Sequence, residues 1–496
     1  MTAEAGLAPV ACASRHLVMH KQAEAFTETS KRAVQNKELQ ARLRVLNGFV
    51  FKRNAAFVEL EDGEALRDCA RAIKEDAIAN LDRYLIELEE SVTRLGGSVH
   101  WARTGQEARA IILDIARRND VKRVVKSKSM VTEEIDLNEA LEQAGIEAIE
   151  TDLGEYIVQL AGERPSHILA PAIHKSRGDI SALFADKLGA VNLVQAEELT
   201  ALARKQLRQK FCTAEMGVTG ANFAVAESGT IVLVENEGNI RLSTTLPRIH
   251  VAVMGIEKVI PAFDDLAIFL KILARSASGQ KMSSYVSFIT GARRDDETDG
   301  AREFHLVLLD NGRTRILEDE EKRESLYCLR CGACLNVCPV YQKIGGHAYG
   351  SVYSGPIGSI ITPQLAGLER VKDLPFASSL CGACKEICPV RINIPHILLS
   401  LRSDWAERKG DRRSGPSLVE RMAFKAWAFA MRHRLIYNLL FRLPAFFQGP
   451  ILKDGKFDRL PFAFGGWTEG RDFPPLAKKS FRKMWREGIG DTDEHR

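Results

Sequence analysis

The spacing of apolar residues predicts helices in the first part of the chain. From about residue 64 onward, apolar side chains recur at the three- and four-residue intervals that place them on one helix face. The residues of this face are Leu81, Leu85, Leu88, Val92 and Leu95. Gly96 and Gly97 follow directly and are expected to end the helical pattern. Residues 1–60 are more polar and irregular, with shorter stretches that favour helices.

Short apolar runs that alternate with helical patterns predict a parallel sheet in the next part. The first runs expected to be strands are SVHWA (98–102), RVVKS (123–127), IEAIET (146–151) and HILAPA (167–172). EARAIILDIARR and LNEALEQAG, which lie between these runs, have the spacing of helices. The strands expected to continue the sheet are FAVAESGTIVLVEN (223–236), IHVAVMGIEKVIPA (249–262), YVSFITG (285–291) and FHLVLLD (304–310). The sequence therefore predicts an α/β fold with a parallel sheet covered by helices.

The composition is that of an ordinary soluble protein. Of the 496 residues, 45% are apolar and 27% are charged, and the net charge is +4. A charge this small for the length gives no reason to expect nucleic acid as a partner. No run of about 18 apolar residues predicts a membrane-spanning helix, and MTAEAGLAPVACASRH lacks the pattern of a secretory signal. We therefore expect a cytoplasmic protein, in which clustered cysteines hold metal rather than form disulfides.

Seven of the ten cysteines fall between residues 328 and 388, in two copies of one pattern. The first copy, C-x2-C-x2-C-x3-C-P, consists of Cys328, Cys331, Cys334 and Cys338. In bacterial ferredoxins, three thiolates of such a run hold one [4Fe–4S] cluster and the fourth ligates the other cluster. The second copy consists of Cys381, Cys384 and Cys388. It has Ser378 where a fourth cysteine would stand.

The ferredoxin rule divides these cysteines between two iron–sulfur clusters. The residues expected to hold the first cluster, of the [4Fe–4S] type, are Cys328, Cys331, Cys334 and Cys388. The residues expected to hold the second cluster are Cys338, Cys381 and Cys384. The second cluster is therefore either [3Fe–4S] or a [4Fe–4S] cluster whose fourth iron binds an oxygen, from Ser378 or from water. Zinc is disfavoured, because seven cysteines at these spacings do not divide into tetrahedral zinc sites.

The cysteine pattern and the changes in composition divide the chain into four expected parts. The 42 residues between Cys338 and Cys381 are too many for a small βαβ ferredoxin and favour a mainly helical ferredoxin-type module. The four parts are an N-terminal extension and helical lead-in (1–60), an α/β domain (61–312), a ferredoxin-type iron–sulfur domain (313–402) and a basic, aromatic, helical tail (403–496). No Asp or Glu occurs from Arg421 to Lys453. We expect this amphipathic stretch either to pack against protein or to lie on the inner face of a membrane.

The sequence shows no motif for a second cofactor. No G-x-G-x-x-G follows an expected strand, and neither a P-loop nor G-x-S-x-G occurs. Because iron–sulfur clusters of this kind carry single electrons, oxidation of an organic substrate is expected to begin on a partner chain. Polar residues at the ends of expected strands nevertheless form a candidate anion site. They are Lys126, Lys128, Ser129, Asn236 and Glu237, and the alternative is that they lie in solvated turns.

The chain resembles a known family in five stretches, residues 126–177, 216–261, 325–363, 378–390 and 465–475. These stretches begin KSKSMVTEEIDLNEALEQAG, MGVTGANFAVAESG, SLYCLRCGACLNVCP, SSLCGACKEICPV and GGWTEGRDFPP. Through them the chain is similar to the lactate-utilisation iron–sulfur proteins, which form one part of a three-component system for L-lactate oxidation. The resemblance implies a CoA-transferase-like lactate-utilisation domain, a ferredoxin-type module that retains all seven cysteine ligands, and a family-specific tail.

The resemblance also implies a role as the electron-transfer component of a complex that oxidises L-lactate to pyruvate. The implied partners are two sister lactate-utilisation proteins, one rich in cysteine and the other with a lactate-utilisation domain of its own, together with an unidentified electron acceptor. On this interpretation the chain is not itself catalytic. Two alternatives stay open. One is an electron carrier for another 2-hydroxy acid such as glycolate, and the other is a CoA-transferase-like enzyme with Glu227 or Glu237 as nucleophile.

Overall fold

The computed structural model describes residues 25–190, 193–407, 418–460, 465–466, 468 and 471–487. The chain forms two compact units, Met1–Asp411 and Arg412–Arg496, and each is described by itself. The three parts expected before residue 403 thus lie in one unit, because a single hydrophobic core runs from the strands into the cysteine-containing segment.

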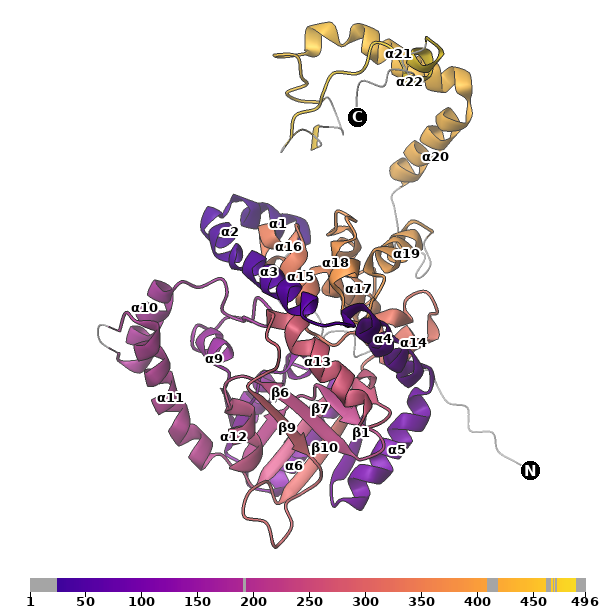
Figure 1. Ribbon diagram of the computed structural model, residues 1–496. Coiled ribbons are helices and arrows are strands. Elements are labelled where there is room, and N and C mark those ends of the chain that lie inside the picture. The colour runs from indigo at the N-terminus through magenta and orange to yellow at the C-terminus, as the bar shows by residue number, and fades with distance from the viewer. Residues whose placement is uncertain are drawn as a thin grey trace, which may run out of the picture. The chain divides into compact units, whose positions relative to one another are not determined.

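A six-stranded parallel sheet forms the centre of the first unit (Figure 1). In spatial order its strands are β1 (Ser98–Ala102), β10 (Glu303–Leu309), β7 (Ile249–Gly255), β4 (Met216–Thr219), β2 (Arg123–Lys126) and β3 (Glu147–Glu150). Each neighbouring pair is parallel, which confirms the expected fold class. Strand β4 has no counterpart among the strands expected from the sequence, because MGVT is too short to stand out as an apolar run.

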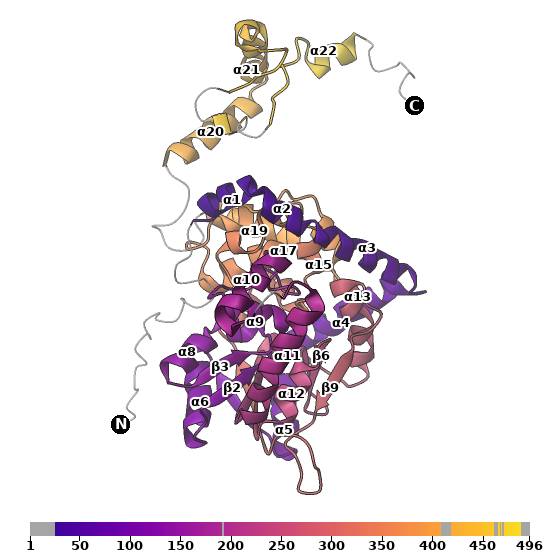
Figure 2. The ribbon, with the colours of Figure 1, turned by 90° about the vertical axis from the view of Figure 1, so that its left-hand side faces the viewer.

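Helices cover both faces of the parallel sheet (Figure 2). On one face lie α6 (Gly105–Arg118), α7 (Met130–Glu134) and α8 (Leu137–Gln143), and on the other lie α9 (Leu153–Leu160), α10 (Arg177–Leu188) and α11 (Ala196–Thr213). Successive side chains of a strand point to opposite faces. Val124 of β2 accordingly packs in one core with Ile112 of α6, whereas Val125 packs in another with Phe211 of α11.

Four further strands form a second, mixed sheet. Its order is β8 (Val259–Ile260), β5 (Phe223–Val225), β6 (Thr230–Glu235) and β9 (Tyr285–Ile289). The expectation that residues 223–236 and 285–291 continue the parallel sheet is therefore wrong. Gly229, at φ 68°, turns the chain back between β5 and β6, so these two strands pair antiparallel and belong to a different sheet. The helices between the strands of the two sheets are α12 (Asn239–Thr245), η1 (Ile256–Lys258) and α13 (Asp265–Ser278).

The expected strand at residues 167–172 is also wrong, because HILAPA forms turns. In a strand, the backbone N–H groups of this segment would donate hydrogen bonds to a neighbouring strand, but here they donate to the ring of His167. Its Nδ1 accepts hydrogen bonds from the N–H groups of Leu169 at 3.0 Å and Ala170 at 3.3 Å. Its Nε2 lies 3.0 Å from Oδ1 of Asn336, which belongs to the cysteine-containing segment.

The segment with the clustered cysteines is mainly helical, as expected. Its elements are α14 (Arg313–Glu318), η2 (Arg323–Tyr327), α15 (Ala333–Val337), α16 (Tyr341–Ile344), η3 (His347–Tyr349), α17 (Gly355–Ala366), η4 (Leu374–Phe376), α18 (Ala383–Ile387) and α19 (Ile394–Glu407). We call residues 313–407 the cysteine module. Its last helix continues beyond the expected boundary at residue 402.

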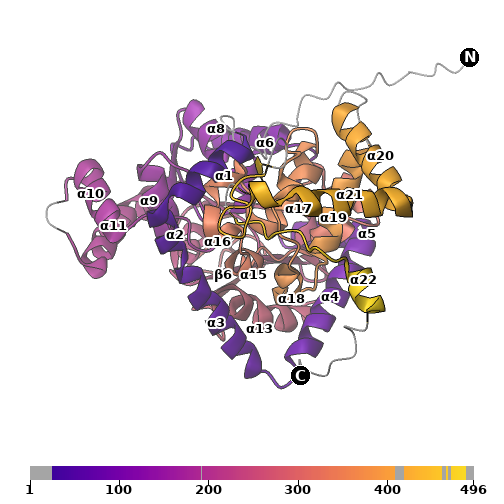
Figure 3. The same ribbon diagram turned by 90° about the horizontal axis from the view of Figure 1, so that it is seen from above.

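Helices from the N-terminal part of the chain pack on the cysteine module. They are α1 (Phe26–Gln35), α2 (Lys37–Leu43), α3 (Val45–Val58) and α4 (Gly63–Ala79). The next helix, α5 (Leu81–Arg94), packs instead beside β1 and β8. The helical pattern from residue 64 to 95 thus forms two helices, which Asn80 separates. Figure 3 shows α3 on one side of α15 and α18 and α4 on the other. Arg67 of α4 donates hydrogen bonds to the carbonyl oxygens of Glu386 at 2.5 Å and Cys388 at 2.9 Å.

The second unit contains α20 (Leu418–Arg432), α21 (Arg434–Phe447), η5 (Gly449–Ile451) and α22 (Phe481–Arg486). Large apolar side chains are exposed along α20 and α21, among them Met422, Phe424, Trp427, Leu435 and Phe446. None of the helices in the described part of the chain combines the length and apolar composition needed to cross a bilayer. Packing against protein and contact with a membrane surface both stay predictions for this unit.

A buried ion network joins the parallel sheet to the cysteine module. The guanidinium of Arg313 in α14 donates to both carboxylate oxygens of Glu134, at 2.9 and 2.8 Å, and to Oε2 of Glu257 at 2.6 Å. These three side chains are at most 2% exposed. The Tyr353 hydroxyl, from the cysteine module, also donates to Glu134. Burial alone would raise the pKa of Glu257, but Arg313 and Arg330 beside it hold that pKa at about 2, so the carboxylate stays charged.

Replacing Arg313 with Met should therefore destabilise the protein strongly. The substitution leaves Glu134 and Glu257 buried without their main counter-charge, a loss of about 3–5 kcal/mol in the free energy of unfolding. Anaerobic urea unfolding measures it. The matched control is Arg118→Met, which breaks an exposed i,i+4 pair with Asp114 and should cost less than about 1 kcal/mol. Equal losses for the two variants would contradict a structural role of the network.

Candidate functional site

Four cysteines from both copies of the pattern line one cavity in the cysteine module. They are Cys328, Cys331, Cys334 and Cys388, the set expected for the first cluster. The other side chains in the lining include Ile168, Leu329, Ile357, Val390 and Ile392. We call this space the cluster cavity. Its wall offers thiols and apolar groups, which is the composition that an iron–sulfur cluster requires.

The local backbone brings these thiols together and directs amides at them. Arg330, between two cysteines, has a left-handed conformation at φ 61°, and its N–H donates to Sγ of Cys328 at 3.4 Å. Gly332, at φ 76°, then caps α15 and reverses the chain. At the other copy, the N–H of Ile392 donates to Sγ of Cys388 at 3.4 Å. Such N–H···S bonds stabilise thiolate and cluster charge and tune cluster potentials.

The chemistry of the thiols fits a metal cluster. Burial raises the pKa of Cys331 to about 12 and that of Cys388 to about 11, so burial alone would keep these thiols protonated. Bound iron reverses this preference, because a coordinating thiol is deprotonated outright. Four thiols around one cavity therefore match the donor set that an iron–sulfur cluster requires.

The remaining three cysteines form a second group nearer to the surface. Burial and the charges of Cys338 and Cys381 raise the pKa of Cys384 to about 12, which reflects how close these three sulfurs lie. Cys338 and Cys384 are buried, whereas Cys381 is exposed. The N–H of Tyr341 donates to Sγ of Cys338 at 3.5 Å. This is the set expected for the second cluster.

Ser378 has the local geometry of the cysteine that it replaces. The N–H of Leu380 donates to Oγ of Ser378 at 3.1 Å, as the N–H of Arg330 donates to Sγ of Cys328 in the first copy. Leu380 and Arg330 are both left-handed, at φ 54° and 61°. The two loops thus share a left-handed residue and an amide hydrogen bond, and the hydroxyl of Ser378 takes the place that the thiol of Cys328 has in the first copy.

A larger cavity, of about 380 Å³, opens at the carboxyl edge of the parallel sheet. We call it the edge cavity. The segments that follow β2, β4 and β7 line it together with the turn after β6. Of the five residues proposed from the sequence, Lys128, Ser129, Asn236 and Glu237 line it, as expected for residues at strand ends. Lys128 and Ser129 are half-buried or buried, whereas Asn236 and Glu237 are exposed in the turn after β6, so the alternative of solvated turns stays open for these two.

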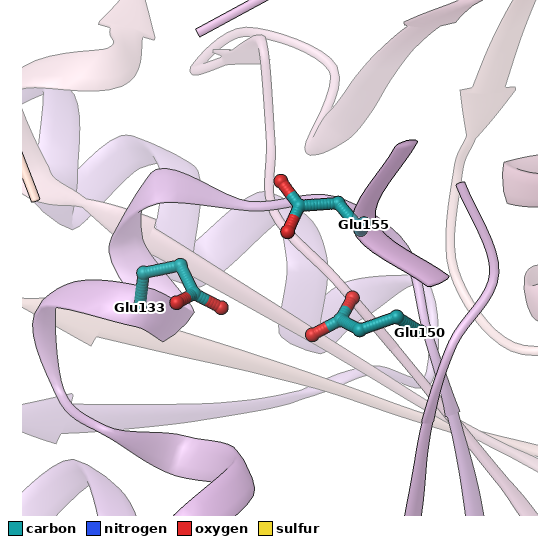
Figure 4. Close-up of side chains that lie close together, drawn as sticks. All are labelled: Glu133, Glu150 and Glu155. Carbon is teal, nitrogen blue, oxygen red and sulfur yellow. The ribbon is translucent and has the colours of Figure 1, made fainter. Parts of the chain in front are cut away.

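Lys126 lies outside the edge cavity. Its ammonium group is 2.6 Å from Glu150 and 3.2 Å from Glu133, and its side chain is 1% exposed. Together with Glu155, these carboxylates form a compact acidic group (Figure 4). Burial and neighbouring carboxylates such as Glu150 raise the pKa of Glu155 well above its usual value. The single positive charge of Lys126 offsets part of the negative charge of this group, and its ammonium is occupied by these ion pairs.

The polar residues at the end of β6 are held by hydrogen bonds to other segments. Asn236 accepts from the N–H of Ser284 at 2.9 Å, and Glu237 accepts from the N–H of Leu153 at 3.1 Å. Burial and the nearby Asp152 raise the pKa of Glu237 to about 7. Glu227, the other proposed nucleophile, is exposed and accepts from the N–H of Phe263 at 3.0 Å, and it does not line the edge cavity.

Three further residues of the edge cavity were missed by the sequence analysis. Ser127, Lys258 and Arg330 all line it. Lys258 follows β7 at the end of an apolar run, and Arg330 lies within the ferredoxin spacing, so neither has a motif of its own. Their shared location depends on how the cysteine module packs on the sheet, which no local pattern records.

The edge cavity and the cluster cavity share one wall. Ile168 and the loop Leu329–Cys331 belong to the linings of both. A molecule bound in the edge cavity would therefore lie against a residue expected to ligate the first cluster. Proteins that use cofactors hold the reactive atom of the cofactor close to the substrate, and two cavities with a common wall allow this arrangement.

Comparison with known proteins places the chain in a family. Lactate utilization protein B of Shouchella clausii is 46% identical over 435 residues, which are 88% of this chain and 90% of the relative. The chain belongs to the lactate utilization protein B family. The proteins of that name from a Geobacillus species and from Bacillus thuringiensis are each 45% identical over 88% and 86% of this chain, and over 91% and 89% of their own lengths.

Three family descriptions match successive parts of the chain, as the family resemblance implies. The LUD domain matches residues 85–309, the 4Fe–4S dicluster domain residues 324–392, and the C-terminal domain of lactate utilisation protein B residues 402–488. The second match contains all seven clustered cysteines. A solved DUF162 family protein from Deinococcus radiodurans covers 46% of this chain and 98% of its own length, at a TM-score of 0.26 and 11% identity.

Replacing Cys331 with Ser should remove the first cluster. The variant is expected to lose about half of the bound iron and the matching part of the visible absorbance, because four of the seven thiols belong to that set. Iron analysis and absorbance spectra of anaerobically purified protein measure this. The control is Cys69→Ser, which changes an exposed cysteine of α4 outside both groups. A C331S protein with the full iron content would contradict the assignment.

Proposed function

We propose that the chain is the iron–sulfur electron-transfer component of a system that oxidises L-lactate to pyruvate. The observation that carries the proposal is the arrangement of its cysteines: one set lies beside a cavity at the sheet edge, and the other reaches the surface. The name of its relatives, lactate utilization protein B, supplies the substrate class.

Two clusters in series would be held by the two groups of cysteines. The ligands proposed for the first cluster are Cys328, Cys331, Cys334 and Cys388, and those for the second are Cys338, Cys381 and Cys384. When bound, the clusters supply transfer of single electrons. The chain's own residues orient the thiols through the amide hydrogen bonds described above and exclude water from the first set. Ser378 is proposed as the oxygen ligand of the second cluster.

The face around the second group is proposed as the exit toward a partner. Cys381 is exposed there, and the ring of Phe376 is 51% exposed. A carrier exchanges electrons only where a cluster comes near the surface, so this face suits one of the two sister lactate-utilisation proteins. The basic, apolar helices α20 and α21 supply a further surface for docking to protein or to the inner face of a membrane.

Deletion of the gene should abolish growth on L-lactate in a strain without another L-lactate oxidase. Growth on D-lactate and on glycolate, measured in parallel, distinguishes L-lactate from another 2-hydroxy acid. The wild-type and C69S genes are expected to restore growth, and the C331S gene is not, since it lacks the first cluster. Restoration by C331S would favour a role independent of the clusters, such as a transferase.

Ser378→Ala should change the second cluster alone. We expect loss of its oxygen ligand to alter the electron paramagnetic resonance signal of the second cluster, toward [3Fe–4S] or toward loss of iron, while the signal of the first cluster persists. Ser378→Cys should restore a four-iron site with thiolate ligands. Ser379→Ala, at the neighbouring exposed position, is the control. Identical spectra for S378A and the wild type would exclude Ser378 as a ligand.

A further inference from the structure

The edge cavity contains donor groups that the electron-transfer role leaves unused. Lys258 is only 7% exposed and lines the cavity, and its ammonium group makes no hydrogen bond or ion pair with any described residue. Oγ of Ser127 and Nη1 of Arg330, in the same lining, are buried and lack hydrogen-bond partners in the described part of the chain. Buried polar groups are normally paired. Unpaired donors in one lining therefore indicate a ligand.

Charged groups lie at two ends of the lining. At one end Lys258 interacts electrostatically with Arg330, with the buried Glu257 and with Cys328, so this end lies beside the first cysteine set. Arg330 also pairs through Nη2 with Glu257 at 3.5 Å, which leaves its Nη1 without a partner among the described residues. At the other end Glu237 interacts with Asp152, Lys128 and Glu235. The carboxylate of Glu235 is already occupied, because it accepts the N–H groups of Ile240 and Arg241. The free donors thus belong to the end nearest the cluster cavity.

The donor chemistry and the size of the cavity favour an organic anion. An ammonium, a guanidinium and a hydroxyl match the oxygens of a carboxylate, and bonds to ionised groups are the strong ones. The volume of about 380 Å³ lies in the range of small-molecule sites and exceeds the needs of an inorganic anion. Leu273, Ala274 and Ala277 of α13 add an apolar wall that suits a carbon chain.

We propose that the edge cavity binds a small organic carboxylate, with its carboxylate toward Lys258, Arg330 and Ser127 and its carbon chain along α13. Among small organic carboxylates, the expected ligand is a 2-hydroxy acid or the matching 2-oxo acid, and this choice rests on the proposed function. The ligand would be held against the shared wall that contains Cys331. The α/β domain is then a substrate-binding site rather than a scaffold for the cysteine module.

Charge compensation is the competing role for the two cations. Lys258 and Arg330 lie near the thiolates and would offset the negative charge of a cluster with or without a ligand. Ser127 separates the two roles, since it is neutral and a hydroxyl cannot offset a cluster's charge. Its unpaired Oγ lies in the same lining. A contribution of Ser127 to carboxylate binding therefore reports on the ligand site.

The test is an anaerobic titration of the full-length protein loaded with iron. L-lactate, pyruvate, 2-hydroxyisocaproate and inorganic phosphate are titrated by calorimetry, and the resonance spectrum of the reduced clusters is recorded with and without each compound. We expect saturable binding of the organic acids and a changed signal of the first cluster. Ser127→Ala should weaken binding about 3-fold or more, and Lys258→Gln about 10-fold or more. The control is Lys271→Gln, which changes an exposed residue of α13 outside the cavity and should leave the affinity for the organic acids unchanged.

Absence of carboxylate binding to the loaded wild-type protein would overturn the proposal. Equal binding of phosphate would do so as well, because it would show a general anion site. A K258Q variant with a shifted cluster potential but unchanged affinity, together with unchanged affinity in S127A, would establish charge compensation instead. The titration needs neither a partner nor turnover, so its result is independent of the growth test. If the deletion strain grew normally on L-lactate while the protein still bound carboxylates, the lactate role would be refuted and the binding site would remain supported.

Discussion

Two buried carboxylates held by one guanidinium fix the relation between the sheet and the cysteine module. Glu134 follows β2, Glu257 follows β7, and Arg313 begins the chain's path from β10 into the module. Tyr353 adds a hydrogen bond from within the module. In water these charges would interact weakly, but in a dry interior each depends on the others. By holding the module on the sheet, this network also fixes the position of the wall that the two cavities share.

The same constraint explains why the cysteine module is not a detachable ferredoxin. The hydrophobic core that contains Phe223 and Phe269 of the α/β part continues without a break to Tyr341 and Ile360 of the module. Arg67, from the helices that precede the sheet, donates to the carbonyl oxygen of Cys388. The clustered cysteines are thus supported both by the core of the α/β part and by a helix that precedes the sheet in the sequence.

The sequence predicted what depends on local spacing and missed what depends on packing. Alternating strands and helices gave the parallel sheet, and strand ends gave Lys128 and Glu237 of the edge cavity. Lys126, which the sequence grouped with them, does not line this cavity, because side chains of a strand alternate and its ammonium lies among carboxylates. The second sheet depends on a turn at Gly229, and Lys258 meets Arg330 only through the docking of the module. Neither leaves a periodic pattern in the chain.

The exposure of Cys381 also determines where the protein is open to oxidative damage. A sulfur that can pass charge to a partner at the surface can equally be reached by dioxygen or peroxide, whereas Cys331 and Cys388 are shielded. Oxidation would therefore begin at Cys381 of the second cysteine group before it reached the buried thiols of the first group. A partner bound over this face would then shield Cys381 from oxidants as well as accept electrons. The chain without its partner would be the form most sensitive to oxygen.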